Sequence, residues 1–399
     1  MSMSALTFQT AIKMESSTRK AAGLGRRKFI ALSTISACAP LFSPLIKAEN
    51  LSDGFAQELY SQELYFSAAT DKNGTHYFVC LNQLGQIVSQ IAVDQRGHDA
   101  IRSPSGRTAV MISRRPGTVL SSFDLLENRL SHQVHSAEGR HFYGHMLFSA
   151  DGKYLFVPEN DYANTRGLIS VRDASTFEVL NEFSSAGLGP HQLGWLSDQK
   201  ALVVANGGII THPSRHREKL NIETMRPNLA YLDSERGDVI DVQELEDPKL
   251  SIRHFDVSDK NEVLVGMQYQ GDKDNRVPLM AIHRPSQKME ALTNIADEEL
   301  RSLNHYVASV AIDSNSRIGL GTCPRGGKIT MWDIDSGDFI ASRRVRDVAG
   351  VTLDAERSEF VVSNGRGEIF RYNTSDFRLN AQASLRISSL RWDNHLQLS

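Results

Sequence analysis

The chain has 399 residues, of which 40% are hydrophobic and 23% are charged, with 28 glycines and 3 cysteines. These fractions are ordinary for a soluble globular protein, and they exclude a collagen, a disulfide-stapled miniprotein and a wholly disordered chain. The 44 basic and 47 acidic residues nearly balance and give a formal net charge of −3. Nucleic-acid binders usually carry a strong basic excess, so we expect no nucleic-acid partner.

Residues 1–48 have the composition of an export leader. Adjacent arginines, Arg26 and Arg27, are followed by Phe29 and a weak apolar stretch, which predicts a twin-arginine signal peptide cleaved near Ala48. An ordinary secretory signal that carries two arginines is the alternative. The four residues ending at Cys38 also fit a lipoprotein processing box, in which Cys38 would be acylated. We therefore expect a periplasmic protein, with a lipid anchor at Cys38 as its only contact with a membrane in the alternative case.

The mature chain keeps two cysteines, Cys80 and Cys323, apart from Cys38 itself. Both lie in apolar, strand-like segments, and nothing in the sequence places them near each other. Two buried free thiols are therefore favoured over a disulfide.

Short apolar runs separated by turn residues fill the chain from about residue 60. The only helical segment expected is the acidic Asp297–Ser302. The runs taken as strands are Thr108–Ser113, Tyr154–Val157, Leu168–Val171, Ala201–Ala205, Glu262–Gly266, Ile318–Gly321, Lys328–Trp332 and Glu359–Ser363. The predicted fold class is all-β.

One unit recurs, and its clearest copy runs from His145 to Asp173. An Asp-Gly turn at 151–152 separates short apolar strands, as in a β-hairpin. Related copies begin near His98, His191, His254, Ser309 and Gly350, at spacings of 47, 46, 63, 55 and 41 residues. This period is typical of propeller blades.

With an N-terminal unit around Leu64–Val93, the repeats predict one seven-bladed β-propeller over residues 49–399. A single four-stranded blade cannot bury both of its faces, so the blades must close into a ring. The tail Leu385–Asn394 is expected to close it by pairing with the first blade. One closed domain of this kind is expected to be a monomer.

Four copies carry a histidine at or beside the same position: His98, His145, His191 and His254. This position begins the innermost strand of a blade, so these side chains should ring one mouth of the central channel. Converging neutral imidazoles could bind iron or another transition metal. In the alternative interpretation, each histidine hydrogen-bonds to the backbone between blades.

The fourth unit is the longest because it contains an unusual segment, Ala205–Leu229. Long insertions in compact β folds are often functional, and the cations here suit an anionic ligand or an acidic partner. Arg325, beside two glycines, could add to such a face. The residues expected to form it are Asn206, Thr211, His212, Arg215, Lys219, Asn221, Arg226 and Arg325. A solvated loop is the alternative.

The same segment, with the pattern Asn206-Gly207-Gly208 to Arg226-Pro227, resembles the bacterial domain-of-unknown-function family 1513. Shared motifs also surround His145 and His191, whereas Cys323 replaces an expected small residue. The resemblance implies a propeller similar to quinoprotein dehydrogenase-like and YVTN-type rings. Members tend to be encoded beside imelysin-like lipoproteins and peroxidase-like proteins, which implies a role in periplasmic iron uptake or redox chemistry with such partners.

Two functions follow from these observations. The first is a non-catalytic exported propeller that binds a ligand or a periplasmic protein partner, and it is favoured because no common catalytic motif occurs in the sequence. The second is an enzyme with a metal or a non-covalent redox cofactor at the histidine-lined channel mouth.

Overall fold

The computed structural model describes residues 57–399. The leader with Arg26, Arg27 and Cys38, and the domain boundary expected at residue 48, lie outside the described residues. Across residues 57–399, no helix is both long enough and apolar enough to cross a membrane.

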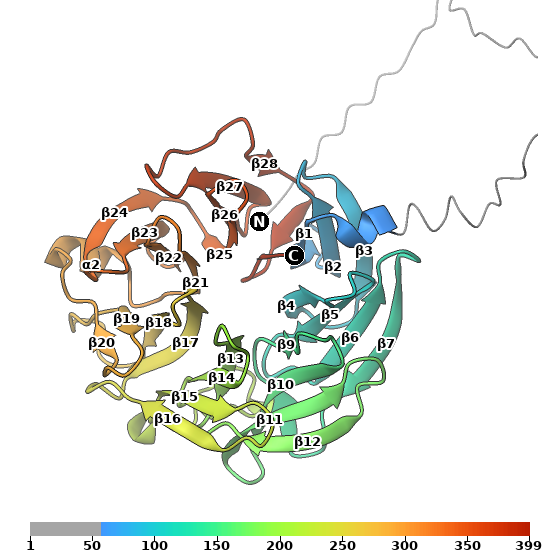
Figure 1. The fold of residues 1–399 in the computed structure, drawn as a ribbon, viewed down its shortest axis with the longest axis horizontal. Helices are drawn as coiled ribbons and strands as arrows, with labels where there is room; N and C mark the ends of the chain where they lie inside the picture. Colours follow the sequence, from blue (N-terminus) through green and yellow to red (C-terminus); the bar gives the residue numbers. More distant parts are fainter. Residues whose placement is uncertain (1–56) are drawn as a thin grey trace, which may run out of the picture. The chain divides into compact units, whose positions relative to one another are not determined.

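Seven antiparallel sheets form a closed ring, which confirms the predicted seven-bladed propeller (Figure 1). Blade 1 consists of β1 (Leu64–Asp71), β2 (His76–Asn82), β3 (Ile87–Val93), β29 (Leu390–Trp392) and β30 (Gln397–Leu398). Blade 2 consists of β4 (Gly97–Arg102), β5 (Thr108–Ser113), β6 (Val119–Asp124) and β7 (Arg129–His135). Blade 3 consists of β8 (Arg140–Phe142), β9 (Leu147–Phe148), β10 (Tyr154–Asp161), β11 (Arg166–Asp173) and β12 (Val179–Ser184).

The remaining blades follow in chain order. Blade 4 consists of β13 (Pro190–Trp195), β14 (Ala201–Asn206), β15 (Asn228–Asp233) and β16 (Val239–Gln243). Blade 5 consists of β17 (Leu250–Val257), β18 (Val263–Tyr269), β19 (Met280–His283) and β20 (Glu290–Ala291). Blade 6 consists of β21 (Ser309–Asp313), β22 (Ile318–Cys323), β23 (Lys328–Asp333) and β24 (Phe339–Arg344). Blade 7 consists of β25 (Val348–Asp354), β26 (Glu359–Asn364), β27 (Glu368–Asn373) and β28 (Leu385–Arg386).

The helical segment expected at α2 (Asp297–Ser302) is present, together with two 3-10 turns, η1 (Pro213–Arg215) and η2 (Ile222–Thr224). Residues 57–61 are also helical, so the expectation of a single helical segment was wrong. Each predicted strand is present, and most extend a few residues beyond the apolar run. The strands are longer than the apolar runs because they also bury polar residues. Glu159 and Asn160, for example, continue β10 and are fully buried.

The ring is closed by the C-terminal tail. β29 pairs antiparallel with β1, with Ala69 opposite Trp392, and β30 pairs with β1 further along. In blade 1, the innermost strands β29 and β30 therefore come from the C-terminus, whereas β1, β2 and β3 come from the start of the domain. The prediction that the tail pairs with the first blade is confirmed for β29, but its first residues, β28, pair with β27 in blade 7.

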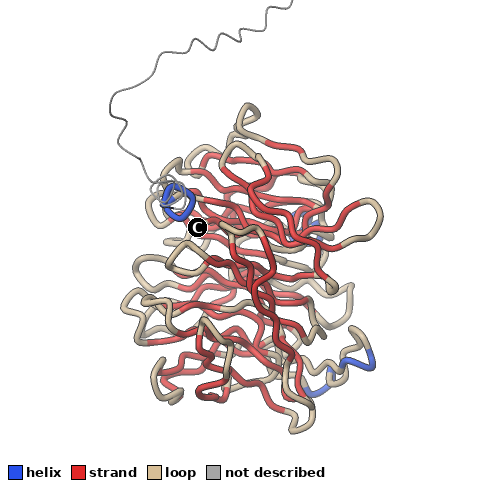
Figure 2. The backbone as a smooth tube through the Cα atoms, turned by 90° about the vertical axis from the view of Figure 1, so that its right-hand side faces the viewer, coloured by secondary structure: helices blue, strands red, loops and turns tan. Residues whose placement is uncertain are grey.

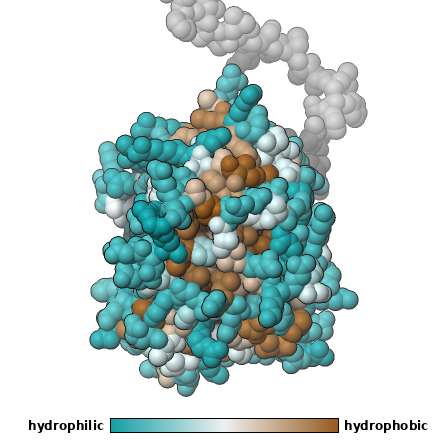
Figure 3. Space-filling model, turned by 90° about the vertical axis from the view of Figure 1, so that its left-hand side faces the viewer, coloured by the Kyte–Doolittle hydropathy of each residue, from teal (hydrophilic) through white to brown (hydrophobic). Residues whose placement is uncertain are grey.

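The hydrophobic core lies between neighbouring blades. Phe78 of blade 1 stacks on Phe123 of blade 2, with ring centroids 4.1 Å apart. Val361 of blade 7 packs with Trp392 of blade 1 across the closure. The strands run between the two faces of the ring, where the loops lie (Figure 2). The side of the ring drawn in Figure 3 is mostly hydrophilic, with several smaller hydrophobic patches.

Cys80 and Cys323 are both buried free thiols, as predicted. Burial raises the pKa of each to about 12. They lie on β2, the third strand of blade 1 from the channel, and on β22, the second strand of blade 6, and neither is a channel-lining strand.

Candidate functional site

Five histidines lie where the innermost strands are irregular. The pairing of β4 with β5 skips His98, and the pairing of β13 with β14 skips His191, so each is the extra residue of a β-bulge. His254 directly follows the extra residue of a third bulge, in β17. His145 and His395 lie in the gaps between β8 and β9 and between β29 and β30. A bulge turns a side chain away from its usual direction, which is how these positions converge.

The five imidazoles form one buried layer across the channel. Eight pairs of rings have centroids between 4.1 and 5.5 Å apart. None of the five residues is more than 5% exposed. The four predicted histidines are therefore brought together, but inside the channel and not at an open mouth.

A glycine allows blades 3 and 4 to approach at this layer. The backbone N–H of His145 donates to the carbonyl oxygen of His191 at 2.8 Å. Gly144 has φ of 153°, and a Cβ there would lie 1.9 Å from that same oxygen. Only glycine fits this close approach, so Gly144 fixes the position of His145.

Three of the histidines have a partner that orients the ring. Nδ1 of His191 donates to the carbonyl oxygen of Tyr143 at 2.9 Å, which leaves Nε2 with its lone pair. Nδ1 of His145 lies 3.0 Å from a carboxylate oxygen of Asp99, and Nδ1 of His254 lies 3.3 Å from the side-chain oxygen of Gln192. Such a contact on one ring nitrogen is typical of metal-binding histidines, because it fixes the tautomer and frees the other nitrogen.

Four ring nitrogens of the layer are buried without hydrogen-bond partners among the described residues. This holds for Nε2 of His145 and of His395, and for both ring nitrogens of His98. An unpartnered buried polar atom costs about 1–3 kcal/mol, so this cluster opposes folding unless something binds it.

Four imidazoles of the layer, those of His98, His191, His254 and His395, are held neutral. Burial, followed by the neighbouring histidines, lowers the pKa of His98 and of His191 well below the usual 6.5. Burial and the neighbouring His145 do the same for His254 and His395. Neutral imidazole is the form that binds a metal ion.

Two sets of ligand atoms meet the distance requirement for a metal: His98, His145 and His191, and His145, His254 and His395, each within 4.8 Å of one another. Ligand atoms of a tetrahedral site with bonds of about 2.0–2.1 Å lie about 3.4 Å apart, so the rings would have to close in by roughly 1 Å. His145 belongs to both sets and has one free nitrogen, so the layer offers a site for a single ion.

The layer separates two cavities. Along the innermost strands, residues that precede a histidine line one cavity, and residues that follow it line the other: Asn394 precedes His395, and Gln397 follows it. The same order holds on β25, where Ala349 lines the first cavity and Thr352 the second.

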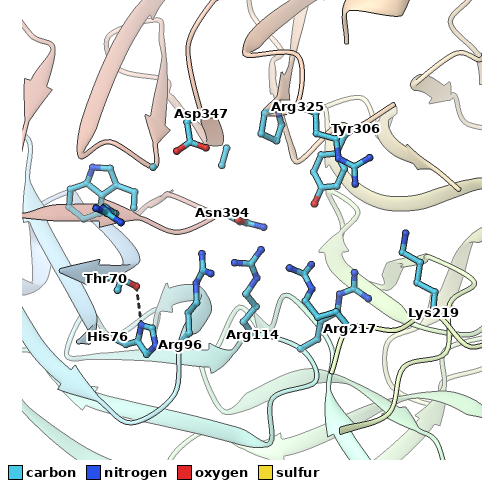
Figure 4. Close-up of a pocket in the computed structure, with 16 residues that line it drawn as sticks. Thr70, His76, Arg96, Arg114, Arg217, Lys219, Tyr306, Arg325, Asp347 and Asn394 are labelled. Atoms are coloured by element: carbon cyan, nitrogen blue, oxygen red, sulfur yellow. Dashed lines mark hydrogen bonds between the residues drawn. The ribbon is translucent and has the colours of Figure 1, made fainter. Parts of the chain in front are cut away.

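The larger cavity has a volume of about 660 Å³ and is strongly cationic (Figure 4). Its 16 lining residues include the seven cations Arg96, Arg114, Arg115, Arg217, Lys219, Arg325 and Arg391, but a single acidic residue, Asp347. The smaller cavity, of about 120 Å³, has a different character, with Asp256, Gln192 and Gln397 among its lining residues. Burial raises the pKa of Asp256 to about 6.

The segment between β14 and β15 brings two cations to the larger cavity. The Asn221 side chain accepts from the backbone N–H of Ile210 at 2.7 Å and donates to the carbonyl oxygen of Gly208 at 2.8 Å. This clamp orders the segment and carries Arg217 and Lys219 over the channel. Lys219 also donates to the side chain of Gln270.

Of the eight residues predicted for an anion or partner face, only Lys219 and Arg325 line this cavity. Three have local structural roles: Asn206 and Thr211 are fully buried and hydrogen-bonded, and Asn221 clamps its own segment.

The other three predicted residues lie elsewhere on the surface or in the loop. Arg215 pairs with Glu218, and Arg226 pairs with Glu244. Nδ1 of His212 accepts from the backbone N–H of Ser214. Six of the eight residues therefore lie outside this cavity, since they form hydrogen bonds or ion pairs elsewhere, and their role in an anion- or partner-binding face stays a prediction.

Sequence reasoning missed His395 and most of the cationic cavity. His395 follows the closing strand β29 and lies 45 residues after the repeat start at Gly350, so the repeat spacing was a signal that could have found it. Arg114 and Arg115 follow β5, and Arg391 lies on β29. The sequence Arg-Arg-Pro at 114–116, directly after a strand, could have indicated the cationic cavity.

Residues 91–399 match the family model described as "Protein of unknown function (DUF1513)". The chain belongs to this family. No curated protein matches the sequence. Among solved structures, this DUF1513 chain is similar to hydrazine synthase of Kuenenia stuttgartiensis, at 13% identity and a TM-score of 0.55, over 81% of this chain and 95% of that one. At this identity the likeness concerns the propeller fold alone.

Proposed function

We propose that this DUF1513 propeller is a non-catalytic binding protein that holds one transition-metal ion in its channel through the histidine layer. The observation that supports this best is the set of five buried, converging imidazoles, three of which (His98, His145 and His395) have ring nitrogens without a hydrogen-bond partner among the described residues. A structural role for the histidines would leave those nitrogens hydrogen-bonded, as buried polar atoms normally are.

The donor set indicates which ions fit. All five ligands are imidazoles, and imidazole suits zinc, copper, iron and nickel. Among residues 57–399 no thiolate contributes, because Cys80 and Cys323 lie on strands that do not line the channel. A carboxylate oxygen of Asp99 lies 3.0 Å from Nδ1 of His145, the ring nitrogen opposite the unpartnered Nε2.

The proposal includes the cellular setting expected from the leader. Export by the twin-arginine pathway delivers folded proteins, so the metal could be loaded before export. A periplasmic role in iron handling, together with a protein partner, is the setting that the family resemblance supports.

The test is a metal titration of chelator-treated protein with Co²⁺, Zn²⁺, Cu²⁺, Ni²⁺ and Fe²⁺. We expect one ion per chain and, for Co²⁺, a visible d–d spectrum. Replacing His145 and His254 together by alanine should abolish the spectrum, since His145 belongs to both ligand sets. The matched control is His135→Ala, because His135 is an exposed residue at the end of the outer strand β7. Binding that survives the double substitution would overturn the proposal.

A second candidate, an enzyme that uses the same metal, is favoured by the cationic cavity next to the layer, which could present an anionic substrate. The coordination number separates the two. A catalytic metal keeps an open position with an exchangeable water, whereas a storage or structural site is saturated by protein ligands. Water-proton relaxation of the Cu²⁺-loaded protein reports this directly: no exchangeable water supports the binding protein, and a fast-exchanging water supports the enzyme.

A further inference from the structure

We infer that the larger cavity is a binding site for a small polyanion, a molecule that carries two or more carboxylate or phosphate groups. The site is distinct from the histidine layer, and it uses the cations that surround the channel mouth (Figure 4). Binding of the polyanion does not depend on a metal in the histidine layer.

The first observation is unbalanced charge. Among residues 57–399, Arg96 and Arg114 share one carboxylate, Asp393. Within the described part of the chain, no ion pair is formed by the other five cations of the cavity, which are Arg115, Arg217, Lys219, Arg325 and Arg391. Five unpaired cations on one concave surface repel one another, and a bound anion would relieve this repulsion.

The second observation is that one cation of the cavity, Arg115, and the neighbouring Arg253 are withdrawn from water. Arg115 is only 9% exposed and donates to the hydroxyl of Tyr143 at 2.9 Å. Behind it, Arg253 is 1% exposed, and one of its guanidinium nitrogens has no hydrogen-bond partner. A buried guanidinium without a carboxylate is costly, so its presence points to an anion that arrives from outside.

The repulsion also appears in the titration of the cavity groups. Burial, together with Arg253, Arg115, Arg325 and Arg217, lowers the pKa of Lys219 to about 8. Burial, together with Arg114 and Arg115, lowers the pKa of Arg217 to about 10. Burial is the larger cause of both shifts, and the neighbouring cations add to it.

Geometry favours a multivalent ligand. The cations come from several blades: Arg115 follows β5, Arg325 follows β22, and Arg391 lies on β29. In Figure 4, Arg96, Arg114 and Arg217 extend into the cavity from one side, with Arg325 on the opposite side. A ligand with a single charged group cannot contact groups on both sides, whereas a volume of about 660 Å³ accommodates a tricarboxylate or a diphosphate. Planar guanidinium groups bind both chemistries in a bidentate manner.

The test uses chelator-treated protein and isothermal titration with citrate and with pyrophosphate, at constant ionic strength. Acetate serves as the monovalent control. We expect citrate or pyrophosphate to bind at one site at least tenfold more tightly than acetate. Tighter binding of citrate identifies a polycarboxylate ligand, and tighter binding of pyrophosphate identifies a phosphorylated one.

The variants are Arg217→Gln and Arg325→Gln, at two cations without an ion pair that lie at different parts of the rim. Each should weaken binding of the preferred anion about tenfold, as expected for the loss of a charged hydrogen bond. The matched control is Arg226→Gln, on the same segment as Arg217 but outside the cavity, where it pairs with Glu244. This variant should bind as the wild type does.

Three results would overturn the inference: no binding of citrate or pyrophosphate at millimolar concentration, equal binding of acetate, or equal affinity in both cavity variants and wild type. Binding of an acidic peptide without binding of either small anion would also overturn it, in favour of a protein partner. The double variant His145→Ala with His254→Ala must retain anion binding, so failure of the metal proposal is distinguishable from failure of this one.

Discussion

Lowering the pH should unfold the metal-free propeller through its histidine layer. His98, His191, His254 and His395 have pKa values well below 6.5 in the folded state, chiefly because they are buried. In the unfolded chain they titrate near 6.5. Since their folded pKa values are depressed, their contribution to stability is fully present above pH 6.5. It is lost as the pH falls below that value, because only the unfolded chain takes up the protons.

The size of the effect follows from the number of protons. Each proton bound only by the unfolded chain lowers the free energy of unfolding by about 1.4 kcal/mol per pH unit, so four histidines give roughly 5.5 kcal/mol per unit. Protonation of Asp256 has the opposite effect on the free energy of unfolding. Its pKa is raised to about 6 in the folded state, so the folded protein takes up this proton before the unfolded chain does. The net slope approaches roughly 4 kcal/mol per unit near pH 5. Against a typical total of about 5–15 kcal/mol, the metal-free protein should unfold near pH 5.

The assay is urea unfolding, followed by tryptophan fluorescence, at a series of pH values between 7.5 and 5. His98→Leu provides the internal comparison, because both ring nitrogens of His98 are buried without partners. The variant should lose about 1.4 kcal/mol per pH unit of the slope and gain about 1 kcal/mol of stability at pH 7, while binding metal more weakly. A free energy of unfolding that is flat from pH 7 to 5 would refute the reasoning, as would a destabilised His98→Leu protein.

Four further outcomes are expected. Gly144→Ala should lower the free energy of unfolding by about 2 kcal/mol and weaken Co²⁺ binding, as urea unfolding and a Co²⁺ titration would report, because its Cβ meets the His191 carbonyl. Cys80 and Cys323 should react with a thiol reagent only in denaturant, and denatured protein that needs a reductant before reacting would contradict the free thiols. Polyanion affinity should fall as the pH rises through about 8, where Lys219 loses its proton, and calorimetry should find this step absent in Lys219→Arg. A chain ended before β29 should lose the cooperative thermal transition, because it lacks the strands that close blade 1.

Local patterns in the sequence determine most of the fold. The repeat starts and the apolar runs predicted the innermost and second strands, because each blade repeats the same pattern of short strands joined by tight turns. The sequence also predicted that four histidines converge, since the repeat places each near the start of an innermost strand. The bulges that turn His98 and His191 into the channel are not visible in the sequence, as they depend on pairing between strands.

The rest of the site depends on closure of the ring. His395 enters the layer only because the C-terminal tail pairs with β1, and it lies one residue beyond the segment predicted to close the ring. The cationic cavity collects residues such as Arg115 and Arg391, which are more than 270 positions apart in the sequence. Polar residues of the long segment looked like ligand groups, but Thr211 and Asn206 satisfy buried hydrogen bonds instead.

X-ray absorption spectroscopy of the protein loaded with one equivalent of Zn²⁺ tests the histidine layer as a metal site most directly. The account predicts a first shell of nitrogen at about 2.0–2.1 Å, with the multiple scattering of at least three imidazoles. It also predicts that this pattern is lost when His145 and His254 are replaced by alanine. A first shell of oxygen or sulfur, or an unchanged spectrum in that variant, would contradict it.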